Sequence, residues 1–329
     1  MKLDKMTVLV TGAGGFVGSH LTEALVERGC KVRAFVHYNS RGDWGLLELF
    51  PKNTLNALEV MRGDILDPNS ARKAAAGCQV IFHLAALIAI PYSYFAPAVV
   101  TATNIGGTVN MLHAGLEAGV QRFIQTSTSE VYGTAQYVPI DEHHPLQGQS
   151  PYSASKIGAD KIAESYFCSF ELPVVIVRPF NIFGPRQSAR AIIPTIISQT
   201  LYRDKIRLGS LIPVRDLTYV KDTVRGFIMA AETEGVLGEV FNIGTGTGIS
   251  IGELANKINS ITGKDNPIEQ DEERIRPEKS EVMRLICGYQ KAQERLGWKP
   301  SYTLEQGLQE TVDFIKEHPT LYKPELYQI

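Results

Sequence analysis

Thr11-Gly12-Ala13-Gly14-Gly15-Phe16-Val17-Gly18 is a glycine-rich segment between a strand-length apolar run at residues 7–10 and a helical pattern at residues 19–28. Its glycines at positions 12, 15 and 18 permit a tight turn and a close approach of the backbone to a ligand. Free amides at the start of a helix attract anions. The order of strand, turn and helix therefore predicts a site for a pyrophosphate, the central group of a dinucleotide.

The alternation of strand and helix continues along the chain. Helical patterns at residues 105–118 and 152–170 lie among apolar runs of strand length at residues 31–36, 58–61, 80–84, 122–126, 174–177 and 240–243. Such alternation is typical of βαβ units, whose strands form one parallel sheet. We expect an α/β fold, namely a Rossmann-type doubly wound parallel sheet with a smaller α/β substrate-binding lobe.

The smaller lobe is expected where the alternation stops. After Arg178-Pro179 the sequence becomes rich in turns, residues 192–201 look helical, and residues 265–284 carry many charges with only isolated apolar residues. We expect a dinucleotide-binding domain at residues 1–179 and 215–247, and a substrate domain at residues 180–214 and 248–329.

The composition excludes several classes of function. The 329 residues include 33 basic and 35 acidic ones without a basic run, which argues against nucleic acid as a partner. The four cysteines are scattered, and no histidine cluster has metal-ligand spacing, so no metal is expected. The most apolar stretch, residues 80–90, ends at Pro91 and is too short to span a bilayer. With no apolar leader at the N-terminus, we expect a cytoplasmic protein without a membrane partner.

The end of the second predicted strand leaves the choice of dinucleotide open. An acid normally stands there and binds the adenosine ribose of NAD, but this chain reads His37-Tyr38-Asn39-Ser40-Arg41. Arg41 suits a 2′-phosphate, whereas Asn39 and Ser40 suit a ribose, so both NAD+ and NADP+ are considered. Besides the glycine-rich segment with Phe16 and Val17, the other candidates for contact with the cofactor are His37, Asp64, Ile65, Leu84, Ala85, Ala86 and Asn104.

Tyr152 and Lys156 lie four residues apart, so they share one face of the helix predicted at residues 152–170. A nearby ammonium favours a phenolate, so Lys156 is expected to lower the pKa of Tyr152 and let it take a proton from an alcohol. Thr128, after the fifth predicted strand, is expected to hydrogen-bond the same alcohol oxygen. Tyr152 and Lys156 are also candidates for cofactor binding.

These motifs occur in one order that resembles the extended short-chain dehydrogenase/reductase family, whose members act on nucleotide sugars. The resemblance covers nearly the whole chain and rests on TGxxGFxG, the acid at Asp64, His83-Leu84-Ala85-Ala86, Asn104 with Gly107-Thr108, and the Tyr152 and Lys156 pair. Later stretches agree, among them 178–185, 215–222 and 242–244.

Ser129-Glu130 narrows the resemblance to the nucleotide-sugar 4,6-dehydratase branch, in particular to enzymes like GDP-mannose and N-acetylglucosamine 4,6-dehydratases. The resemblance implies oxidation at carbon 4 of a UDP- or GDP-hexose, loss of water across carbons 5 and 6 with Glu130 as the base, and return of the hydride to carbon 6. The cofactor would stay bound and be regenerated, with NAD+ slightly favoured. Ser129 stands where relatives often have an acid, which leaves open which group protonates the leaving oxygen.

The resemblance also implies substrate contacts and an assembly. Arg215 and Arg276 are expected to bind the diphosphate, with Asn181 beside them and Pro91 bordering the sugar. A homodimer through the helices that begin near Asn104 and Tyr152, or a larger homo-oligomer, is expected.

Three other functions remain as alternatives. A UDP-glucuronate decarboxylase would share the Thr-Ser-Glu sequence but needs an arginine facing the carboxylate. A nucleotide-sugar 4-epimerase would not need Glu130. A redox-sensing dinucleotide-binding protein would not need Tyr152, Lys156 and Glu130 together.

Overall fold

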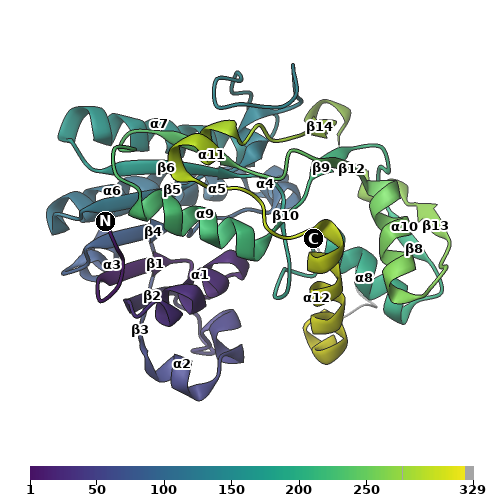
Figure 1. The fold of residues 1–329 in the computed structure, drawn as a ribbon, viewed down its shortest axis with the longest axis horizontal. Coiled ribbons are helices and arrows are strands. Elements are labelled where there is room, and N and C mark those ends of the chain that lie inside the picture. Colours follow the sequence, from purple (N-terminus) through teal and green to yellow (C-terminus); the bar gives the residue numbers. More distant parts are fainter. Residues whose placement is uncertain (276, 323–329) are drawn as a thin grey trace.

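The computed structural model describes residues 1–275 and 277–322, and its centre is a seven-stranded parallel sheet (Figure 1). The strand order is β11-β6-β5-β4-β1-β2-β3, so the chain starts in the middle, runs to one edge and then crosses to the other. All seven strands predicted from the sequence are present, with ends shifted by no more than a few residues. They are β1 Thr7–Thr11, β2 Lys31–His37, β3 Leu58–Gly63, β4 Val80–His83, β5 Arg122–Thr126, β6 Val174–Pro179 and β11 Val240–Ile243.

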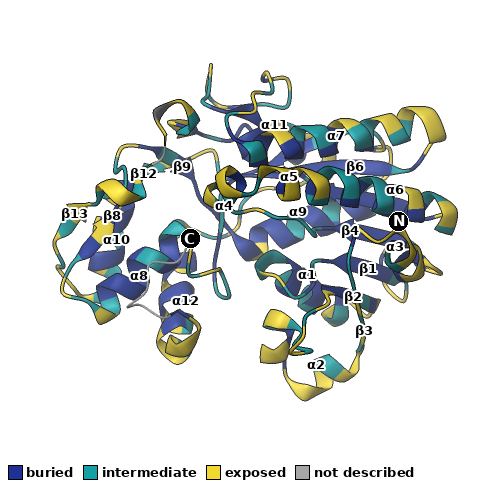
Figure 2. Ribbon diagram, turned by 180° about the vertical axis from the view of Figure 1, so that it is seen from behind, coloured by how far each residue is buried: buried dark blue, intermediate teal, exposed yellow. Residues whose placement is uncertain are grey.

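Helices cover both faces of the sheet, which gives the doubly wound Rossmann-type fold that the sequence predicts. α1 (Phe16–Glu27) packs beside α9 (Val220–Glu232) on one face. α3 (Pro68–Ala75), α6 (Gly107–Ala118) and α7 (Pro151–Phe170) pack together on the other. The inner strands are buried, the edge strand β3 is only partly buried, and the outer helix faces are exposed (Figure 2). Since both faces are covered, the strands are apolar runs rather than alternating ones.

Two helices differ from their predicted starts. α1 begins at Phe16 rather than residue 19, because Gly15 already stands at the N-cap position. α6 begins at Gly107 rather than residue 105, and a π-helical turn (Ala102–Gly106) joins it to α5 (Pro97–Thr101). Single π-helical turns are often found at functional sites.

A second group of elements lies beside one end of the large sheet (Figure 1). α8 (Ile192–Tyr202), α10 (Ile251–Thr262) and α12 (Leu304–Glu317) pack together. Three small sheets join this group: β8 (Ile206–Leu208) with β13 (Ile268–Gln270), β7 (Ile182–Phe183) with β10 (Thr218–Tyr219), and β9 (Val214–Asp216) between β12 (Gly248–Ser250) and β14 (Arg284–Leu285).

The remaining elements are short. α11 (Gln290–Leu296) packs on β11 of the large sheet, although it lies within the predicted substrate segment, and the domain boundaries stay a prediction. The others are α2 Lys52–Asn56, α4 Ile90–Phe95 and the 3-10 turns Gly45–Leu49, Ser129–Tyr132, Glu272–Arg274, Glu278–Ser280 and Pro319–Leu321. No helix in the described residues is both long enough and apolar enough to cross a membrane.

The glycine-rich segment is closely packed against itself and against β4. A Cβ atom at Gly18 would lie 2.1 Å from the carbonyl oxygen of Gly12, and one at Gly12 would lie 3.0 Å from the backbone of Ala85. Gly12 also has a φ of +71°, which disfavours any other residue. The first turn of α1 can therefore approach the sheet only because these positions have no side chain.

Burial lowers the pKa of two histidines, His83 in the core and the partly exposed His20. His83, at the end of β4, bonds through Nδ1 to Thr11 Oγ1 at 2.9 Å and through Nε2 to Thr108 Oγ1 at 3.2 Å. Burial lowers the pKa of His83 from 6.5 to about 3. Burial likewise lowers the pKa of His20 from 6.5 to about 4, and the neighbouring Arg186 adds to that effect. Both side chains are therefore neutral in the folded protein at neutral pH.

Gly18→Ala tests the close packing of the glycine-rich segment. The added methyl group would force the backbone of Gly12 to move, and overpacking of this kind costs about 1–3 kcal/mol of unfolding free energy. Denaturant unfolding measures the loss. Gly252→Ala in α10 is the control, because its Cβ would be no closer than 3.6 Å to a neighbour. Equal stability of the Gly18→Ala variant and the wild type would contradict the packing described here.

His83→Gln tests the link between burial and acid sensitivity. Below pH 6.5 the unfolded chain protonates this histidine while the folded chain stays neutral down to about pH 3, so acidification favours unfolding. We expect the slope of unfolding free energy against pH to fall by about 1.4 kcal/mol per pH unit in the variant. Denaturant unfolding at a series of pH values measures it.

The exposed His113 on α6 provides the matched control, as His113→Gln. A second variant, His20→Gln, repeats the test at an independent site between pH 6.5 and about 4. If neither buried variant flattens the dependence of stability on pH, the neutral state of these histidines is ruled out.

Candidate active site

One pocket of about 1160 Å³ extends from the glycine-rich segment to β9. It lies at the carboxyl ends of the sheet strands, where open α/β sheets bind ligands. Nineteen of the residues singled out from the sequence line it: Gly12, Gly15, Phe16, Val17, Gly18, His37, Asn39, Asp64, Ile65, Leu84, Ala85, Ala86, Pro91, Thr128, Ser129, Glu130, Tyr152, Asn181 and Arg215. Ser40, Arg41, Asn104 and Lys156 do not line it, and Arg276 lies outside the described residues.

Tyr152 is positioned by the start of α7. Ser150 and Ser153 cap this helix reciprocally: the Ser150 side chain accepts from the Ser153 amide at 3.1 Å, and the Ser153 side chain accepts from the Ser150 amide at 3.0 Å. Pro151, the first helical residue, has a backbone angle already suited to a helix. The cap thus fixes where Tyr152 stands at the pocket wall.

Lys156 lies one turn further along α7 and is buried behind Tyr152. Its Nζ donates to the carbonyl oxygen of Thr126 at 2.6 Å, at the end of β5. Burial lowers the pKa of Lys156 from 10.5 to about 8, and the charge of Asp160 opposes that effect. The lysine therefore joins α7 to the strand that precedes Thr128.

The expectation that the pKa of Tyr152 is lowered is wrong when only the groups of the protein itself act on the phenol. Burial raises the pKa of the Tyr152 phenol above its ordinary value, a hydrogen bond with Thr128 lowers it, and the charges of Glu130 and Asp160 raise it. The Lys156 ammonium donates to the Thr126 carbonyl group, and burial with the two carboxylates sets the direction of the shift in the pKa of Tyr152.

Thr128, Ser129 and Glu130 form the tight turn that follows β5. The Thr128 side chain caps this turn by accepting from the Glu130 amide at 3.2 Å, and Gly133, with a φ of +63°, ends it. Glu130 is 8% exposed and Ser129 is 1% exposed, yet both line the pocket. The turn therefore brings a carboxylate and two hydroxyl groups next to Tyr152.

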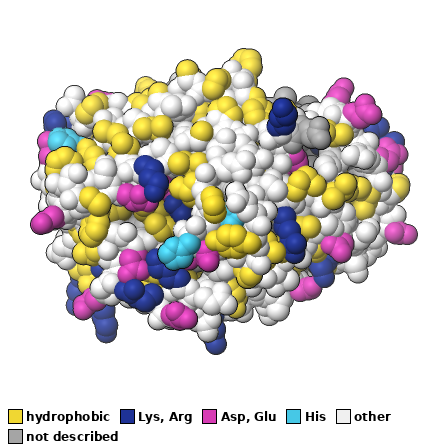
Figure 3. Space-filling model, turned by 90° about the horizontal axis from the view of Figure 1, so that it is seen from above, with side chains coloured by type: hydrophobic (Ala, Val, Ile, Leu, Met, Phe, Trp, Pro, Cys, Tyr) yellow, Lys and Arg dark blue, Asp and Glu magenta, His cyan; other side chains and the backbone are white. Residues whose placement is uncertain are grey.

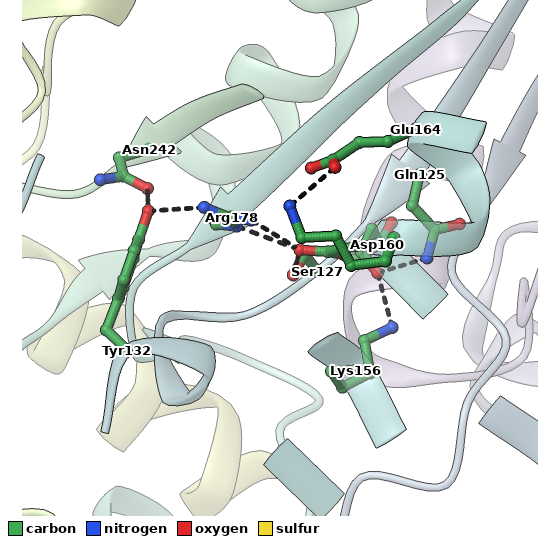
Figure 4. Close-up of polar contacts among 10 residues, drawn as sticks. Gln125, Ser127, Tyr132, Lys156, Asp160, Glu164, Arg178 and Asn242 are labelled. Atoms are coloured by element: carbon green, nitrogen blue, oxygen red, sulfur yellow. Dashed lines mark hydrogen bonds and ion pairs between the residues drawn. The ribbon is translucent and has the colours of Figure 1, made fainter. Parts of the chain in front are cut away.

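Beneath these residues lies a buried polar network that the sequence analysis did not identify (Figure 4). Asp160 accepts from Ser127 Oγ at 2.7 Å and from Arg178 Nε at 3.1 Å, and its side chain has no exposed surface. Arg178 also donates to the Tyr132 hydroxyl at 3.1 Å, and that hydroxyl donates to Asn242 Oδ1 at 2.7 Å. Asp160 follows Lys156 by one helical turn, so it lies on the same buried face of α7. A charged residue on that face was the signal in the sequence that could have pointed to this network.

Asn104 lies in the π-helical turn, behind the pocket wall. Its Oδ1 accepts from the Leu87 amide at 2.8 Å, and its Nδ2 donates to the Leu87 carbonyl group and to Ser155 Oγ, both at 2.9 Å. Leu87 belongs to the wall and Ser155 to α7. Asn104 thus holds the segment after β4 against the helix that carries Tyr152.

The segment after β2 is arranged differently from the expectation. The Arg41 side chain is 87% exposed and Ser40 is also exposed, so neither faces the pocket. Asp43 and Trp44 do line the pocket, and they were not identified from the sequence. They lie several residues after the end of β2, which is where the acid that binds the adenosine ribose is normally found.

At its far end the pocket is bordered by charged residues. Arg215 donates to Glu281 Oε1 at 3.2 Å, and Arg190, Arg274 and Glu281 also line the pocket, although the sequence analysis did not single out these three. Asn181 Oδ1 and Gln187 Oε1 are buried without a hydrogen-bond partner among the described residues. These polar groups make this end suited to an anionic, hydrogen-bonding ligand.

Next to Arg215, Asp216 faces a different set of groups. Its carboxylate accepts from the amides of Thr245 and Gly246 at 2.8 Å each and from the amide of Cys287 at 3.1 Å. Burial raises the pKa of Asp216, and these hydrogen bonds oppose that effect. Asp216 thereby joins the segment after β11 to the segment after β14.

The residues at the other end of the pocket fit a dinucleotide. The glycine-rich segment leaves its backbone open at the start of α1, and side chains at Gly12, Gly15 or Gly18 would fill the space that the backbone needs.

Within residues 1–275 and 277–322, no three His, Cys, Asp or Glu residues gather as a metal site. Basic and acidic side chains are interspersed on the face shown in Figure 3.

Comparison with known proteins identifies the family of the chain. Residues 9–311 match the family described as GDP-mannose 4,6 dehydratase. The dTDP-glucose 4,6-dehydratase of Streptomyces griseus is 33% identical over 326 residues, which cover 96% of this chain and 96% of that protein.

Solved structures include both epimerases and dehydratases. Epimerase Mth375 of Methanothermobacter thermautotrophicus matches with a TM-score of 0.89 and 29% identity, over 98% of this chain and 95% of that one. DesIV of Streptomyces venezuelae, a dTDP-glucose 4,6-dehydratase solved with NAD and TYD bound, matches with a TM-score of 0.86 and 29% identity, over 97% of this chain and 99% of that one. The chain belongs to the GDP-mannose 4,6 dehydratase family, among the short-chain dehydrogenase/reductase type of nucleotide-sugar dehydratases and epimerases.

Proposed function

We propose that the protein is an NAD(P)-dependent nucleotide-sugar 4,6-dehydratase, which makes a 4-keto-6-deoxy sugar. The observation that carries the proposal is the placement of Glu130 in the same pocket wall as Tyr152 and close enough for its charge to act on the phenol. Oxidation of a sugar alcohol needs the tyrosine but no such acid. An elimination does need one.

The glycine-rich segment, the pocket residues of β2 and β3 and the Leu84, Ala85 and Ala86 segment would hold the dinucleotide. When bound, its oxidised nicotinamide would accept a hydride from carbon 4, return it to carbon 6 and add a positive charge near Tyr152. Lys156 and Asn104 would act from behind the wall by fixing α7 and the Leu87 segment.

In the first step Tyr152 takes the proton of the carbon 4 hydroxyl group. Burial raises the pKa of the phenol, so Tyr152 must first release its own proton to the solvent, an ionisation that the positive charge of a bound oxidised nicotinamide would favour. Thr128 opposes that rise through its hydrogen bond, and we propose that it also hydrogen-bonds the sugar oxygen. The carbon 4 ketone that results makes the proton on carbon 5 acidic.

In the second step Glu130 removes the carbon 5 proton while the carbon 6 hydroxyl group leaves as water. Glu130 then returns a proton to carbon 5 when the hydride arrives at carbon 6, so the two electrons taken from carbon 4 end on carbon 6. Ser129 is too weak an acid at neutral pH to protonate the leaving oxygen. We propose that Glu130, or a water oriented by Ser129, supplies that proton. If Glu130 supplies it, the carboxylate takes a further proton from the solvent before it protonates carbon 5.

The far end of the pocket supports a nucleotide diphosphate as the anionic part of the substrate. Arg215 is suited to its oxygens because a guanidinium group can donate two parallel hydrogen bonds. Asn181 Oδ1, an acceptor in the same pocket wall, suits a hydroxyl group of the substrate rather than the diphosphate. We propose a UDP- or GDP-hexose, in particular the N-acetylglucosamine form, with Pro91 bordering the sugar. The two-domain boundaries, a homodimer or larger homo-oligomer and a cytoplasmic location are part of the same proposal.

The reaction is tested with a panel of UDP-, GDP- and dTDP-sugars in deuterated water, with products followed by NMR and mass spectrometry. We expect loss of water and deuterium at carbon 5, because Glu130 exchanges its proton with the solvent before returning it. Release of carbon dioxide would instead establish the UDP-glucuronate decarboxylase. Inversion at carbon 4 without loss of mass would establish the 4-epimerase.

Glu130→Gln separates oxidation from elimination. The amide keeps the size of the side chain but cannot accept the carbon 5 proton, so reduced nicotinamide should accumulate while product formation falls by about a hundredfold or more. Single-turnover measurements follow the absorbance of reduced nicotinamide and the amount of product. Glu164→Gln, on the surface of α7, is the matched control. Product formation at the wild-type rate in Glu130→Gln would remove Glu130 from the mechanism.

A further inference from the structure

We propose that Asp43 binds the adenosine ribose hydroxyl groups of the cofactor and selects NAD+ over NADP+. The inference rests on the proposed function, because it takes the pocket to be a dinucleotide site. It names the residue that replaces the acid missing from the end of β2, where His37 stands.

The segment that carries Asp43 folds back onto the glycine-rich segment. The Leu46 amide donates to the Gly14 carbonyl group at 2.9 Å, and a Cβ at Gly14 would lie 2.6 Å from the carbonyl oxygen of Trp44. Gly45 has a φ of +64°, and its own Cβ would lie 2.6 Å from the Gly14 oxygen. This contact is so close that residues 43–45 form a fixed part of the pocket wall beside the start of α1.

The Asp43 side chain is held over the end of β2. Asn39 Nδ2 donates to Asp43 Oδ1 at 3.2 Å and to the Asp43 carbonyl oxygen at 3.1 Å, while Asn39 Oδ1 accepts from the Arg41 amide at 3.1 Å. The Asp43 side chain is 34% exposed and lines the pocket. The end of the second strand is where this fold places the adenosine ribose, so a carboxylate in this position can accept from its hydroxyl groups.

The charges around this position favour a ribose over a 2′-phosphate. A phosphate monoester carries a charge of about −1.5 to −2 at neutral pH, and it would face the Asp43 carboxylate. Arg41 Nε pairs with Asp43 Oδ2 at 3.3 Å, but its side chain is 87% exposed and is outside the pocket wall. Arg62, near Gly42, also lies outside the wall.

Two other titratable groups border this part of the pocket. The His37 side chain is 76% exposed, and its Nδ1 lies 3.9 Å from Asp64 Oδ2. Asp64 itself lines the wall after β3. Among the charged side chains near this position, the carboxylates of Asp43 and Asp64 line the wall, whereas the two arginines do not.

The test is the affinity of the full chain for NAD+ and for NADP+ by calorimetric titration without a sugar substrate, after removal of any copurifying nucleotide. We expect the wild type to bind NAD+ at least about tenfold more tightly, because like-charge contacts disfavour the wrong ligand. Asp43→Asn keeps the shape and removes the charge, so the ratio of the two affinities should fall by about tenfold. Asp313→Asn on the surface of α12 is the matched control.

Arg41→Ala separates the two candidate determinants. If Asp43 determines the preference between the two dinucleotides, the Arg41→Ala variant should still prefer NAD+, and its affinity for NADP+ should not rise. The inference is overturned if the wild type binds NADP+ as tightly as NAD+, or if Asp43→Asn leaves the ratio unchanged. Failure of the wild type to bind either dinucleotide would instead overturn the proposed function, from which this inference follows.

Discussion

The buried ion pair between Asp160 and Arg178 is the interaction on which the site depends. Both side chains are almost fully buried, and burying two charges is costly unless each has well-placed partners. Here Ser127 and Tyr132 supply further hydrogen bonds, and Asn242 extends the chain of contacts to β11. Removing one partner of such a pair typically costs about 3–5 kcal/mol, so α7, the end of β5, β6 and β11 are constrained to one arrangement.

The reactive groups are attached to this network rather than to flexible loops. Lys156 precedes Asp160 by one turn of α7 and holds the last carbonyl group of β5, and Thr128 begins the turn two residues later. Asn104 adds a second connection, from α7 through Ser155 to the segment after β4. The packed core of the sheet therefore fixes the positions of Tyr152, Thr128 and Glu130 relative to one another.

The sequence was sufficient for the sheet and for most of the residues that it predicted to line one pocket. Strands buried on both faces are continuous apolar runs, and the glycines stand in a strand-turn-helix context. It was insufficient where a function depends on how a loop folds back. Asp43 enters the pocket only because residues 43–45 pack on Gly14. Arg190, Arg274 and Glu281 line the same pocket as Arg215 although they come from distant parts of the chain. The direction of the shift in the pKa of Tyr152 was also missed, because it depends on burial and on the nearby carboxylates of Glu130 and Asp160.

Two neighbouring residues of β9, Arg215 and Asp216, have separate roles in the structure. Asp216 ties together the segments after β11 and β14, whereas Arg215 faces the pocket. The contacts of Asp216 do not involve Arg215, so the pocket-facing position and the joining position can vary separately. The far end of the pocket can therefore change without disturbing the large sheet.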